Sequence, residues 1–503
     1  MKWLDELIVN HDRDLPAIVD HDDRAFSYGD LADMVEVMAR ALAEHGVRPG
    51  DRIMLVSENC ATYAVTVLAA FKLKAWISPI NARQSVEELE AIKRHSGARC
   101  MVFTPEASTA SAEHAKRLVA FTLGSLPCGQ ILVTQTYDVA PEPAADDPKL
   151  QVAALMYTTG TTSAPKGAML THDNLIWNAT QSAKLRQMAL GDVVLAVLPG
   201  THIFGFASAL LASFFAGVTI RFMPRYSPQA VLQSFAEGAS VMPAVPQMYQ
   251  GIVQYLEERG EKPNAPKLRY ISSGGAPLDP EWKAKIESFF GLPLNNGYGL
   301  TETSPGVAAT RPDNPRDDIS VGEVMEDVEI LIDQPDADGI GELLIRGPNI
   351  MKGYYRDENT TRDVLRPDGY FCSGDFARVG SNGELYIVGR KKELIIRSGF
   401  NVYPPEVEAM LTRHPDIRQA AVVGRNVHGN EEILAFLLSS GSLSEADVRA
   451  WLHDRLVGYK IPQHFLIVDS FPTAPTGKIL KHRLTEVYAD LLEARDVNPT
   501  RDT

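Results

Sequence analysis

A segment rich in hydroxyls and glycine, Thr-Thr-Gly-Thr-Thr-Ser-Ala-Pro-Lys-Gly, spans residues 158–167 and follows an apolar run. Backbone N–H groups and small hydroxyls in such a loop can surround phosphate oxygens, and the Lys166 ammonium can offset a β or γ phosphate charge. It is not the P-loop of NTPases, because Gly167 rather than Ser or Thr follows the lysine, and Ala168 comes next. The segment therefore predicts a phosphate-binding loop, with a polar surface turn as the alternative.

A second glycine-containing segment, Asn-Asn-Gly-Tyr-Gly-Leu-Thr-Glu-Thr, spans residues 295–303. It lacks the third glycine of a dinucleotide fingerprint. This argues against a Rossmann-type cofactor site.

Composition narrows the function classes. The chain has 503 residues, 45% hydrophobic and 22% charged, with a formal net charge of -15. This charge disfavours a nucleic-acid binder, since neutralising phosphates requires a basic surface. Its four cysteines have neither metal-ligand nor disulfide-framework spacing, which favours a reducing, cytoplasmic location.

The elements that position these loops follow an α/β rhythm. Ser27 and Asp30 have the spacing of a helix capping box, and an apolar helical period follows. A strand at 53–56, a helix at 62–74 and a strand at 76–79 then predict a parallel sheet. Another apolar strand, at 152–157, begins a second α/β unit after the polar connector 139–149.

The hydrophobic pattern changes from residue 193 onward. The uncharged stretch 193–220 is interrupted by Pro199, Gly200 and His202, so it predicts a buried helix rather than a membrane span. From 321 to 388, short runs in which hydrophobic and polar residues alternate predict an antiparallel or barrel-like subdomain. A final α+β segment follows. The N-terminus lacks the apolar core and cleavage site of a secretory signal.

The sequence resembles the adenylate-forming superfamily of acyl-CoA synthetases, nonribosomal adenylation domains and luciferases. The resemblance covers essentially the whole length of the chain, and the motifs occur in the family's order. Any one motif could occur by accident, but seven in the same order could hardly do so. The matching segments are TTGTTSAPKG at 158–167, LPGTHIFGF at 198–206, SSGGAPL at 272–278, NNGYGLTET at 295–303, YFCSGD at 370–375, GRKKELIIRSGFNVYPPEVE at 389–408 and PTGKIL at 475–480.

The resemblance implies an α/β fold with two domains. A large N-terminal domain, residues 1–390, would contain two α/β sheet units and a β-barrel-like subdomain, and would hold the ATP and acyl pocket. A small, mobile α+β domain, residues 391–503, would carry the catalytic lysine. The resemblance also makes a homodimer an expectation.

The implied activity is ATP-dependent carboxylate–CoA ligation through an acyl-AMP intermediate, with release of AMP and pyrophosphate and with Mg²⁺ as cofactor. The expected substrate is a hydrophobic monocarboxylic acid, either a fatty acid, as in fatty acid metabolism, or an aryl acid of the 4-coumarate type. Alternatives are an enzyme that loads a carrier-protein phosphopantetheine, a luciferase-type oxygenase and a catalytically silent nucleotide-binding protein. No fused carrier domain follows Lys478, which favours free CoA.

Two anions meet when a carboxylate attacks the α-phosphate of ATP, so the site needs cations to shield them. By resemblance, Glu302 holds Mg²⁺, and Lys478 reaches the substrate carboxylate and α-phosphate. The alternatives are an exposed loop glutamate and a solvated turn lysine.

The remaining nucleotide contacts are also assigned by resemblance. Asp375 would accept hydrogen bonds from both ribose hydroxyls, and Arg390 would contact the ribose or phosphates. Gly274, Gly275 and Ala276 with Asn296, Gly297 and Tyr298 would form the walls of an adenine slot; the alternative is two tight turns with a core tyrosine. The expected ATP and AMP ligands are Thr158, Thr159, Gly160, Thr161, Thr162, Lys166, Gly274, Gly275, Ala276, Asn296, Gly297, Tyr298, Gly299, Thr301, Glu302, Asp375, Arg390 and Lys478.

His202 resembles the family histidine beside the acyl carboxylate, with a buried helix-capping histidine as the alternative. The acyl-pocket candidates are apolar, small or neutral, which disfavours a dicarboxylate, although aromatic residues in such positions are more often plain core. They are His202, Phe204, Phe206, Tyr249, Gly275, Gly299, Thr303 and Gly306.

Lys392 stands at the family's hinge position, where the last domain would swing to exchange Lys478 for a CoA-facing loop. That loop contains the predicted pantetheine tunnel residues Ser398, Gly399 and Phe400. Thr158, Ala164 and the Cys372-Ser373 pair depart modestly from the family pattern and leave the implied reaction in place.

Overall fold

The computed structural model describes residues 2–158, 165–398, 400–427, 430–439, 441, 443–473 and 479–492. The chain forms two compact units, one of Met1–Ile330 with Ile345–Cys372 and one of Leu331–Leu344 with Ser373–Thr503. The functional boundary expected between residues 390 and 391 stays a prediction.

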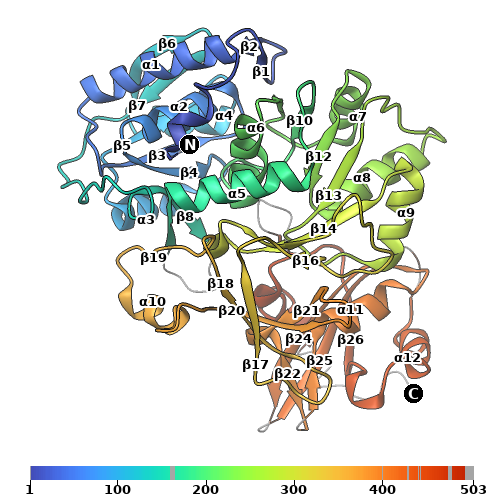
Figure 1. Cartoon of the computed structure of the whole chain (residues 1–503). Helices are drawn as coiled ribbons and strands as arrows, with labels where there is room; N and C mark the ends of the chain where they lie inside the picture. The colour runs from blue at the N-terminus through green and yellow to red at the C-terminus, as the bar shows by residue number, and fades with distance from the viewer. Residues whose placement is uncertain are drawn as a thin grey trace. The chain divides into compact units, whose positions relative to one another are not determined.

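The first unit contains two large sheets with helical cover (Figure 1). In the first sheet the order is β19-β9-β8-β4-β3-β5-β7-β6, and β8, β4, β3 and β5 run parallel. The predicted βαβ pattern is confirmed. The strands are β3 (Arg52–Ser57), β4 (Trp76–Asn81), β5 (Cys100–Phe103), β6 (Phe121–Leu126), β7 (Gly129–Val133), β8 (Val152–Thr158), β9 (Lys166–Thr171) and β19 (Gly353–Tyr354).

Helix boundaries around this sheet have local causes. The Ser27 hydroxyl accepts a hydrogen bond from the Asp30 N–H, and the Asp30 carboxylate accepts one from the Ser27 N–H, so the predicted capping box is present. The helix predicted over 62–74 ends two residues earlier, because Lys74 has a φ of 52° and turns the chain into β4. The helices are α1 (Tyr28–Glu44), α2 (Ala61–Lys72), α3 (Val86–Ser96), α4 (Thr109–Arg117), α5 (His172–Leu185) and α10 (Glu358–Val364).

The second sheet has the order β16-β15-β14-β13-β12-β10-β11-β1-β2, and its strands from β14 to β1 are parallel. Its strands are β1 (Pro16–Val19), β2 (Ala25–Ser27), β10 (Val193–Ala196), β11 (Thr219–Phe222), β12 (Val241–Ala244), β13 (Tyr270–Ser273), β14 (Leu294–Gly299), β15 (Gly306–Ala309) and β16 (Glu323–Val324). Its helices are η2 (Phe204–Leu211), α6 (Ala212–Ala216), α7 (Pro228–Ala236), α8 (Pro246–Glu257), α9 (Pro280–Phe290) and η3 (Thr301–Thr303).

The uncharged stretch 193–220 begins with strand β10 and continues into the π-helix η2 and helix α6, most of which is buried. Among the helices described, none is both long enough and apolar enough to cross a membrane. All four cysteines are free, and Cys60, Cys100 and Cys128 are buried.

The second unit contains an open four-stranded sheet in the order β17-β18-β20-β21, followed by a smaller α+β region. β20 and β21 are antiparallel, as the alternating pattern predicted. The elements are β17 (Glu329–Asp333), β18 (Gly341–Arg346), β20 (Phe371–Val379), β21 (Leu385–Arg390), η4 (Lys391–Glu393), β22 (Ile395–Arg397), β23 (Phe400–Val402), α11 (Pro404–Thr412), β24 (Ile417–Val427), β25 (Asn430–Ser439), α12 (Glu445–His453), η5 (Gly458–Lys460), β26 (His464–Ile467), η6 (Lys481–Arg483) and α13 (Leu484–Val487).

Candidate active site

The predicted phosphate loop connects two antiparallel strands of the first sheet. Thr158 at the end of β8 pairs with Lys166 at the start of β9, so the two ends of the loop meet. Thr159, Gly160, Thr161 and Thr162 lie outside the described residues. Lys166 is therefore held by a strand, which fixes the base of its side chain.

Tyr354 links Lys166 to Glu302. It lies on β19, which pairs with β9, and its hydroxyl donates a 2.6 Å hydrogen bond to Glu302 Oε1. The Lys166 Nζ atom is 5.8 Å from the centroid of the Tyr354 ring. Burial, and then the Glu302 charge, raise the pKa of Tyr354, so its phenol stays protonated and donates.

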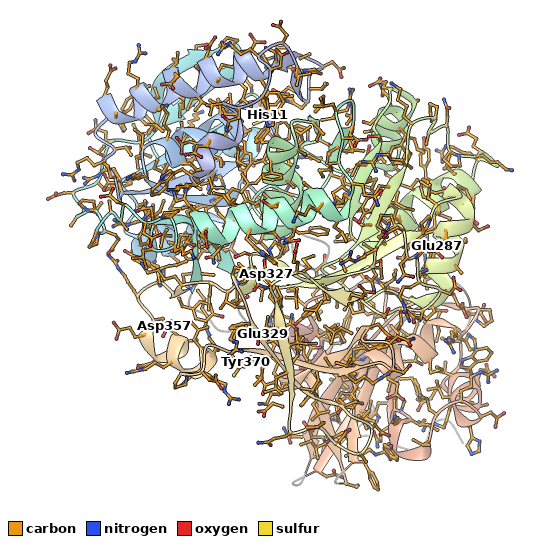
Figure 2. The ribbon with its side chains drawn as sticks, in the orientation of Figure 1. His11, Glu287, Asp327, Glu329, Asp357 and Tyr370 are labelled. Carbon is orange, nitrogen blue, oxygen red and sulfur yellow. The ribbon has the colours of Figure 1, made fainter. Side chains whose placement is uncertain are left out.

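Tyr354 therefore contacts both the Lys166 ammonium and the Glu302 carboxylate. Its hydroxyl bonds only one of the two carboxylate oxygens. The sequence analysis missed Tyr354, because it is 52 residues from Glu302 and the two meet only through contacts between distant segments, such as the Met351 N–H on the Glu302 carbonyl. Near them, Asp357 begins helix α10 (Figure 2). Hydrogen bonds from Thr360 lower the pKa of Asp357, and the charge of Lys166 lowers it further.

Glu302 has surroundings that fit a magnesium ion bound together with phosphates. It lies on the short helix η3, is half-buried, and its carbonyl accepts the Met351 N–H at 2.9 Å. Magnesium sites of this kind use one or two carboxylates and leave the remaining positions to phosphates and water. One carboxylate from a fixed helical turn is enough for this role.

The predicted acyl and adenine residues meet at the carboxyl ends of the second sheet. His202 and Phe204 follow β10, Gly274 follows β13, and Gly297 lies in β14. A Cβ added at Gly274 would lie 3.2 Å from the Phe204 ring and 3.4 Å from the Gly297 carbonyl oxygen. Phe204 therefore lies against Gly274, in the region where open parallel sheets bind ligands.

His202 is exposed, so the buried capping histidine that was its alternative is not what the structure contains. Its Nδ1 accepts the Phe204 N–H at 3.3 Å, which leaves the tautomer with a proton on Nε2. Gly275 is also exposed, and Ala276 is half-buried.

Gly299 is a position where the structure requires glycine. A Cβ there would lie 1.8 Å from the Pro305 carbonyl oxygen. Tyr298 and Thr301 on either side are half-buried. Asn296 is buried, and its amide donates to the carbonyls of Ile319 and Ser320, both at 3.2 Å. Asn296 thus braces the strand that carries this loop.

Four acyl-pocket candidates make contacts typical of core residues. Phe206 and Tyr249 have no exposed surface; Phe206 packs edge-on against Phe71, and the Tyr249 hydroxyl donates to the Met242 carbonyl at 2.6 Å. Thr303 is fully buried, and its hydroxyl donates to the Pro305 carbonyl. A Cβ on Gly306 would lie 2.7 Å from the Met325 sulfur. Their place in an acyl pocket stays a prediction.

In the second unit, Asp375 and Arg390 form an ion pair. They are cross-strand partners on β20 and β21, with Arg390 Nε 2.8 Å from Asp375 Oδ1. The Asp375 side chain is only 2% exposed, and its N–H donates to the Ser373 hydroxyl at 3.0 Å. This arrangement holds the carboxylate in one orientation.

The hinge and tunnel candidates also lie in the second unit. Lys392 is exposed on η4, and the Ser398 N–H donates to Asn430 Oδ1 at 2.7 Å. Phe400 is exposed, and its ring stacks on Tyr459 with centroids 4.6 Å apart. The sequence analysis did not identify Tyr459. Gly399 and Lys478 lie outside the described residues.

Lys481, three positions after Lys478, was also missed. Its Nζ is 2.7 Å from Glu408 Oε1 and 3.4 Å from Glu393 Oε2, which joins η6 to α11 and to the helical turn that contains Lys392. Desolvation lowers the pKa of Lys481, but the two carboxylates outweigh it and the net shift is upward. The ammonium therefore stays charged within this bridge.

Comparison with known families gives two successive matches along the chain. A model described as AMP-binding enzyme matches residues 6–355, and one described as AMP-binding enzyme C-terminal domain matches residues 406–478.

Similar curated proteins are CoA ligases. A feruloyl-CoA synthase from Amycolatopsis is 34% identical over 478 residues, covering 92% of this chain and 94% of that protein. A 4-coumarate–CoA ligase from Pinus taeda is 30% identical, covering 94% and 91%. A 2-succinylbenzoate–CoA ligase from Geobacillus kaustophilus is 31% identical, covering 92% and 93%.

Solved structures share the whole fold. ATP-bound MatB from Rhodopseudomonas palustris superposes with a TM-score of 0.85 at 27% identity, covering 98% of this chain and 100% of that one. An o-succinylbenzoate CoA synthetase from Bacillus subtilis, in complex with ATP and magnesium, gives 0.81 at 26% identity, covering 96% and 99%.

Proposed function

Because the chain belongs to the AMP-binding enzyme family and is an AMP-forming acid–thiol ligase, we propose that it converts a hydroxycinnamate-like aryl acid to its CoA thioester. The observation that carries the proposal is the Lys166–Tyr354–Glu302 group, which combines a phosphate-binding cation with a braced carboxylate. A cytoplasmic location and a homodimer stay predictions.

In the first step, a carboxylate oxygen of the acid attacks the α-phosphorus of ATP and pyrophosphate leaves. Lys166 and the loop after Thr158 bind the β and γ phosphates. Glu302 would hold Mg²⁺, which would supply positive charge to the phosphates. Lys478 neutralises the acid carboxylate and the α-phosphate, and Asp375 with Arg390 orients the ribose.

In the second step, the CoA thiolate attacks the acyl carbonyl and AMP leaves. Rotation about Lys392 withdraws Lys478 and brings Ser398, Gly399 and Phe400 to the pantetheine arm. The exposed aromatic surface of Phe400 on Tyr459 suits the partly apolar arm.

An aryl acid is favoured over a fatty acid for two reasons. The names of the curated relatives given above all refer to aromatic acyl groups: feruloyl, coumaroyl and succinylbenzoyl. The Phe204 ring on Gly274 also offers a flat wall against which an aromatic ring can pack. Phe204, Gly274 and Gly275 carry no charge, which favours a single carboxylate.

The test measures AMP formation with ATP and Mg²⁺ across ferulic, 4-coumaric, benzoic and C8–C16 fatty acids, with and without CoA. We expect CoA-dependent turnover that is highest with a hydroxycinnamic acid. Preference for a fatty acid would overturn the substrate class. If acyl-AMP accumulated and did not react with added CoA, the acceptor would be a carrier protein. If no acid gave AMP, the chain would be a silent nucleotide-binding protein.

A further inference from the structure

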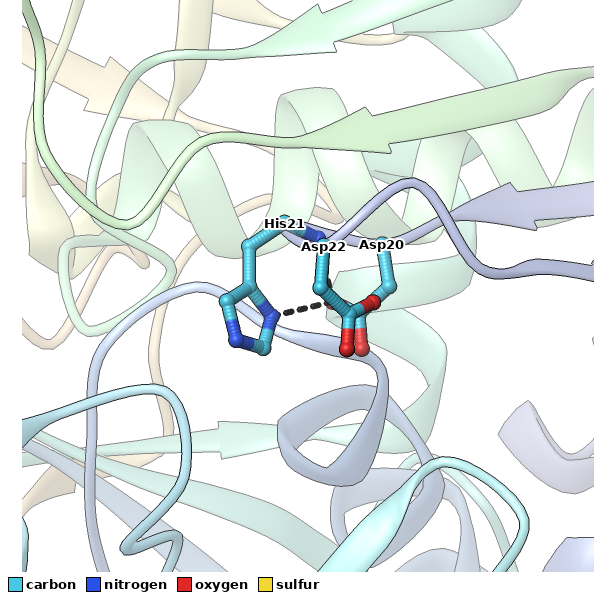
Figure 3. A group of neighbouring side chains, drawn as sticks. All are labelled: Asp20, His21 and Asp22. Carbon is cyan, nitrogen blue, oxygen red and sulfur yellow. Dashed lines mark hydrogen bonds and ion pairs between the residues drawn. The ribbon is translucent and has the colours of Figure 1, made fainter.

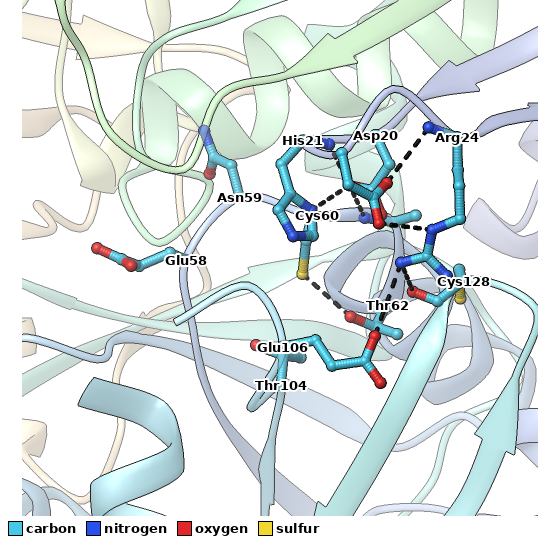
Figure 4. Close-up of polar contacts among 12 residues, drawn as sticks. Asp20, His21, Arg24, Glu58, Asn59, Cys60, Thr62, Thr104, Glu106 and Cys128 are labelled. Carbon is cyan, nitrogen blue, oxygen red and sulfur yellow. Dashed lines mark hydrogen bonds and ion pairs between the residues drawn. The ribbon is translucent and has the colours of Figure 1, made fainter. Parts of the chain in front are cut away.

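A short segment at the reversal of the first sheet reaches across to the second sheet. From β3 the chain passes through α2 to β4 on one side, then through α3 to β5 on the other side of β3. The carboxyl end of β3 therefore lies at a topological switch point, and residues 58–60 connect it to α2. Figure 4 shows this connection with Asp20 and His21.

A cavity of about 500 Å³, the first-sheet cavity, lies at this connection, and its lining includes Asp20, Glu58, Glu106 and Met223. The Glu58 carboxylate in its wall is paired, with its Oε1 2.7 Å from Arg83 Nε and 3.6 Å from Arg225 Nε. Asn59 does not line this cavity. Its amide bonds the second sheet instead.

Both ends of the Asn59 side-chain amide bond backbone groups of the second sheet. Its Nδ2 donates to the Ala196 carbonyl at 2.9 Å and to the Leu198 carbonyl at 2.8 Å, and its Oδ1 accepts the Gly200 N–H at 2.7 Å. The Met223 carbonyl is a longer contact, 3.3 Å from Nδ2. A primary amide has two N–H donors and one acceptor oxygen, so asparagine matches these backbone groups and leucine matches none of them.

The loop that Asn59 bonds has left the strand pairing of its own sheet. β10 ends at Ala196, the last of its residues that pairs with β11. Leu198 in the loop is 5% exposed, and Asn59 is 4% exposed. Buried backbone groups outside a ladder still need hydrogen-bond partners, and Asn59 supplies them from the neighbouring sheet.

Tyr63, in the first turn of α2, holds the other side of Gly200. Its hydroxyl donates to the Gly200 carbonyl, and a Cβ added at Gly200 would lie 2.7 Å from its ring. Burial raises the pKa of Tyr63, so the phenol stays protonated and donates. The N–H and the carbonyl of Gly200 are therefore both bonded by side chains that follow β3.

A contact in the opposite direction fixes the start of α2. Asp20, which follows β1 of the second sheet, accepts the Ala61 N–H at 2.9 Å with its Oδ1. The same oxygen is 3.0 Å from His21 Nδ1, and Figure 3 shows this pair. The base of the Asn59 side chain is fixed as a result, because Ala61 lies only two residues later.

The position of Gly200 determines where His202 and Phe204 lie. The His202 N–H donates to the Pro199 carbonyl at 3.0 Å, so the two sides of Gly200 are joined. A Cβ on Gly205 would lie 2.3 Å from the Pro199 carbonyl oxygen, so the start of η2 packs directly on the loop. A displacement of Gly200 would therefore move both side chains.

We propose that Asn59, together with Tyr63, is a positioning residue for the acid: it holds the loop 197–202 in the place where His202 and Phe204 contact the substrate. The inference rests on the proposed function, in which Phe204 forms a wall of the acyl site. Neither Asn59 nor Tyr63 lies in any of the motif segments identified in the sequence.

The test compares Asn59→Leu with Gln151→Met, a matched loss of a buried amide. Gln151 is 1% exposed; its Nε2 donates to the carbonyls of Lys74 and Val152, and its Oε1 accepts the Ala145 N–H. For the acid that turns over fastest in the panel above, we expect Asn59→Leu to raise KM at least about tenfold. KM for ATP should not change, because the displaced loop contacts the acid. Gln151→Met should leave both KM values unchanged.

A second measurement follows the loop itself and needs no activity. Hydrogen exchange of peptides covering residues 197–206, read by mass spectrometry without substrates, should be at least about tenfold faster in Asn59→Leu, because the Gly200 N–H loses its acceptor. If Asn59→Leu does not fold, Tyr63→Phe replaces it, since that variant loses one hydrogen bond and keeps the ring on Gly200. It should produce the same two changes at smaller size.

Unchanged exchange in these peptides would overturn the proposal. Faster exchange with an unchanged KM for the acid would also overturn it, as would equal increases in both KM values, since each result leaves Asn59 a purely structural role. If the native chain made no AMP with any acid, the proposed function would fail. Calorimetric binding of ferulic acid to the native chain and to Asn59→Leu would then decide the inference, and equal affinities would overturn it.

Discussion

The two open sheets of the first unit carry different chemistry at corresponding places. The second sheet also reverses direction, between β10 and β12, and Phe204, Gly274 and Gly275, which follow β10 and β13, are small or aromatic and uncharged. The first sheet brings Glu58 and Glu106 to its own reversal, where Asp20 at the end of β1 lines the same cavity. Equivalent topology thus provides one place suited to the proposed acyl-adenylate and another where carboxylates pair with guanidinium groups.

The largest expected effect is at Gly299. Its added Cβ would lie 1.8 Å from a backbone oxygen, so Gly299→Ala must displace the loop that carries Glu302. We expect AMP formation to fall about 100-fold, because misplacing catalytic groups by an ångström costs this much. Gly124→Ala on β6, where nothing lies within 4 Å, is the control and should keep full activity. Equal activity of the two variants would contradict the role of this loop.

Stability should depend on pH through His172, the first residue of α5. Burial lowers the pKa of His172 to about 3, and its Nδ1 accepts the Leu4 N–H. Below pH 6.5 the His172 imidazole becomes protonated in the unfolded chain but stays neutral in the folded chain. The free energy of unfolding should therefore fall by about 2 kcal/mol between pH 7 and 5. Denaturant titrations should show this extra loss in the native chain and not in His172→Gln. Equal losses would contradict a neutral buried imidazole.

Tyr354→Phe tests the brace on Glu302. Loss of the hydroxyl leaves the carboxylate free to rotate, so we expect kcat for AMP formation to fall about tenfold, the cost of one charge-assisted hydrogen bond. The magnesium concentration for half-maximal rate should rise as well. Tyr370→Phe is the control, because that ring packs against Arg346 and makes no contact with Glu302. An unchanged magnesium dependence would remove Tyr354 from the site.

The smallest effect is expected from filling the first-sheet cavity. Ala230→Met, on helix α7, reduces the volume of the cavity that Glu58, Glu106 and Met223 line, and it replaces no residue of the candidate active site, so AMP and acyl-CoA formation should change less than about twofold. A tenfold loss of either activity, with stability retained, would mean that the two places are not independent.

Sequence reasoning identified the parts that depend on local pattern. The capping box at Ser27, the alternation of β3, α2 and β4, and the order of the family motifs needed only neighbouring residues. By contrast, the Tyr354 contact with Glu302 depends on tertiary contacts between segments about 50 residues apart, which no local spacing encodes.

The burial of individual side chains in the predicted acyl pocket could not be predicted from the sequence either. Phe206 and Tyr249 lie in or near motif segments, yet both are fully buried, Phe206 against Phe71 and Tyr249 in the core of the second sheet, whereas Phe204 is only half-buried. Side chains on one helix differ in this way according to the neighbours they meet. The Lys481 bridge to Glu393 and Glu408 likewise required three segments to come together.

The most direct test of the two-step account separates the half-reactions in Lys478→Ala. We measure feruloyl-AMP formation from ferulic acid and ATP, and separately CoA thioester formation from synthetic feruloyl-AMP. The account predicts that the first rate falls at least about 100-fold, since a cation facing the transition-state charge is lost, while the second changes less than about threefold. Equal losses in both half-reactions, or full activity in the first, would contradict it.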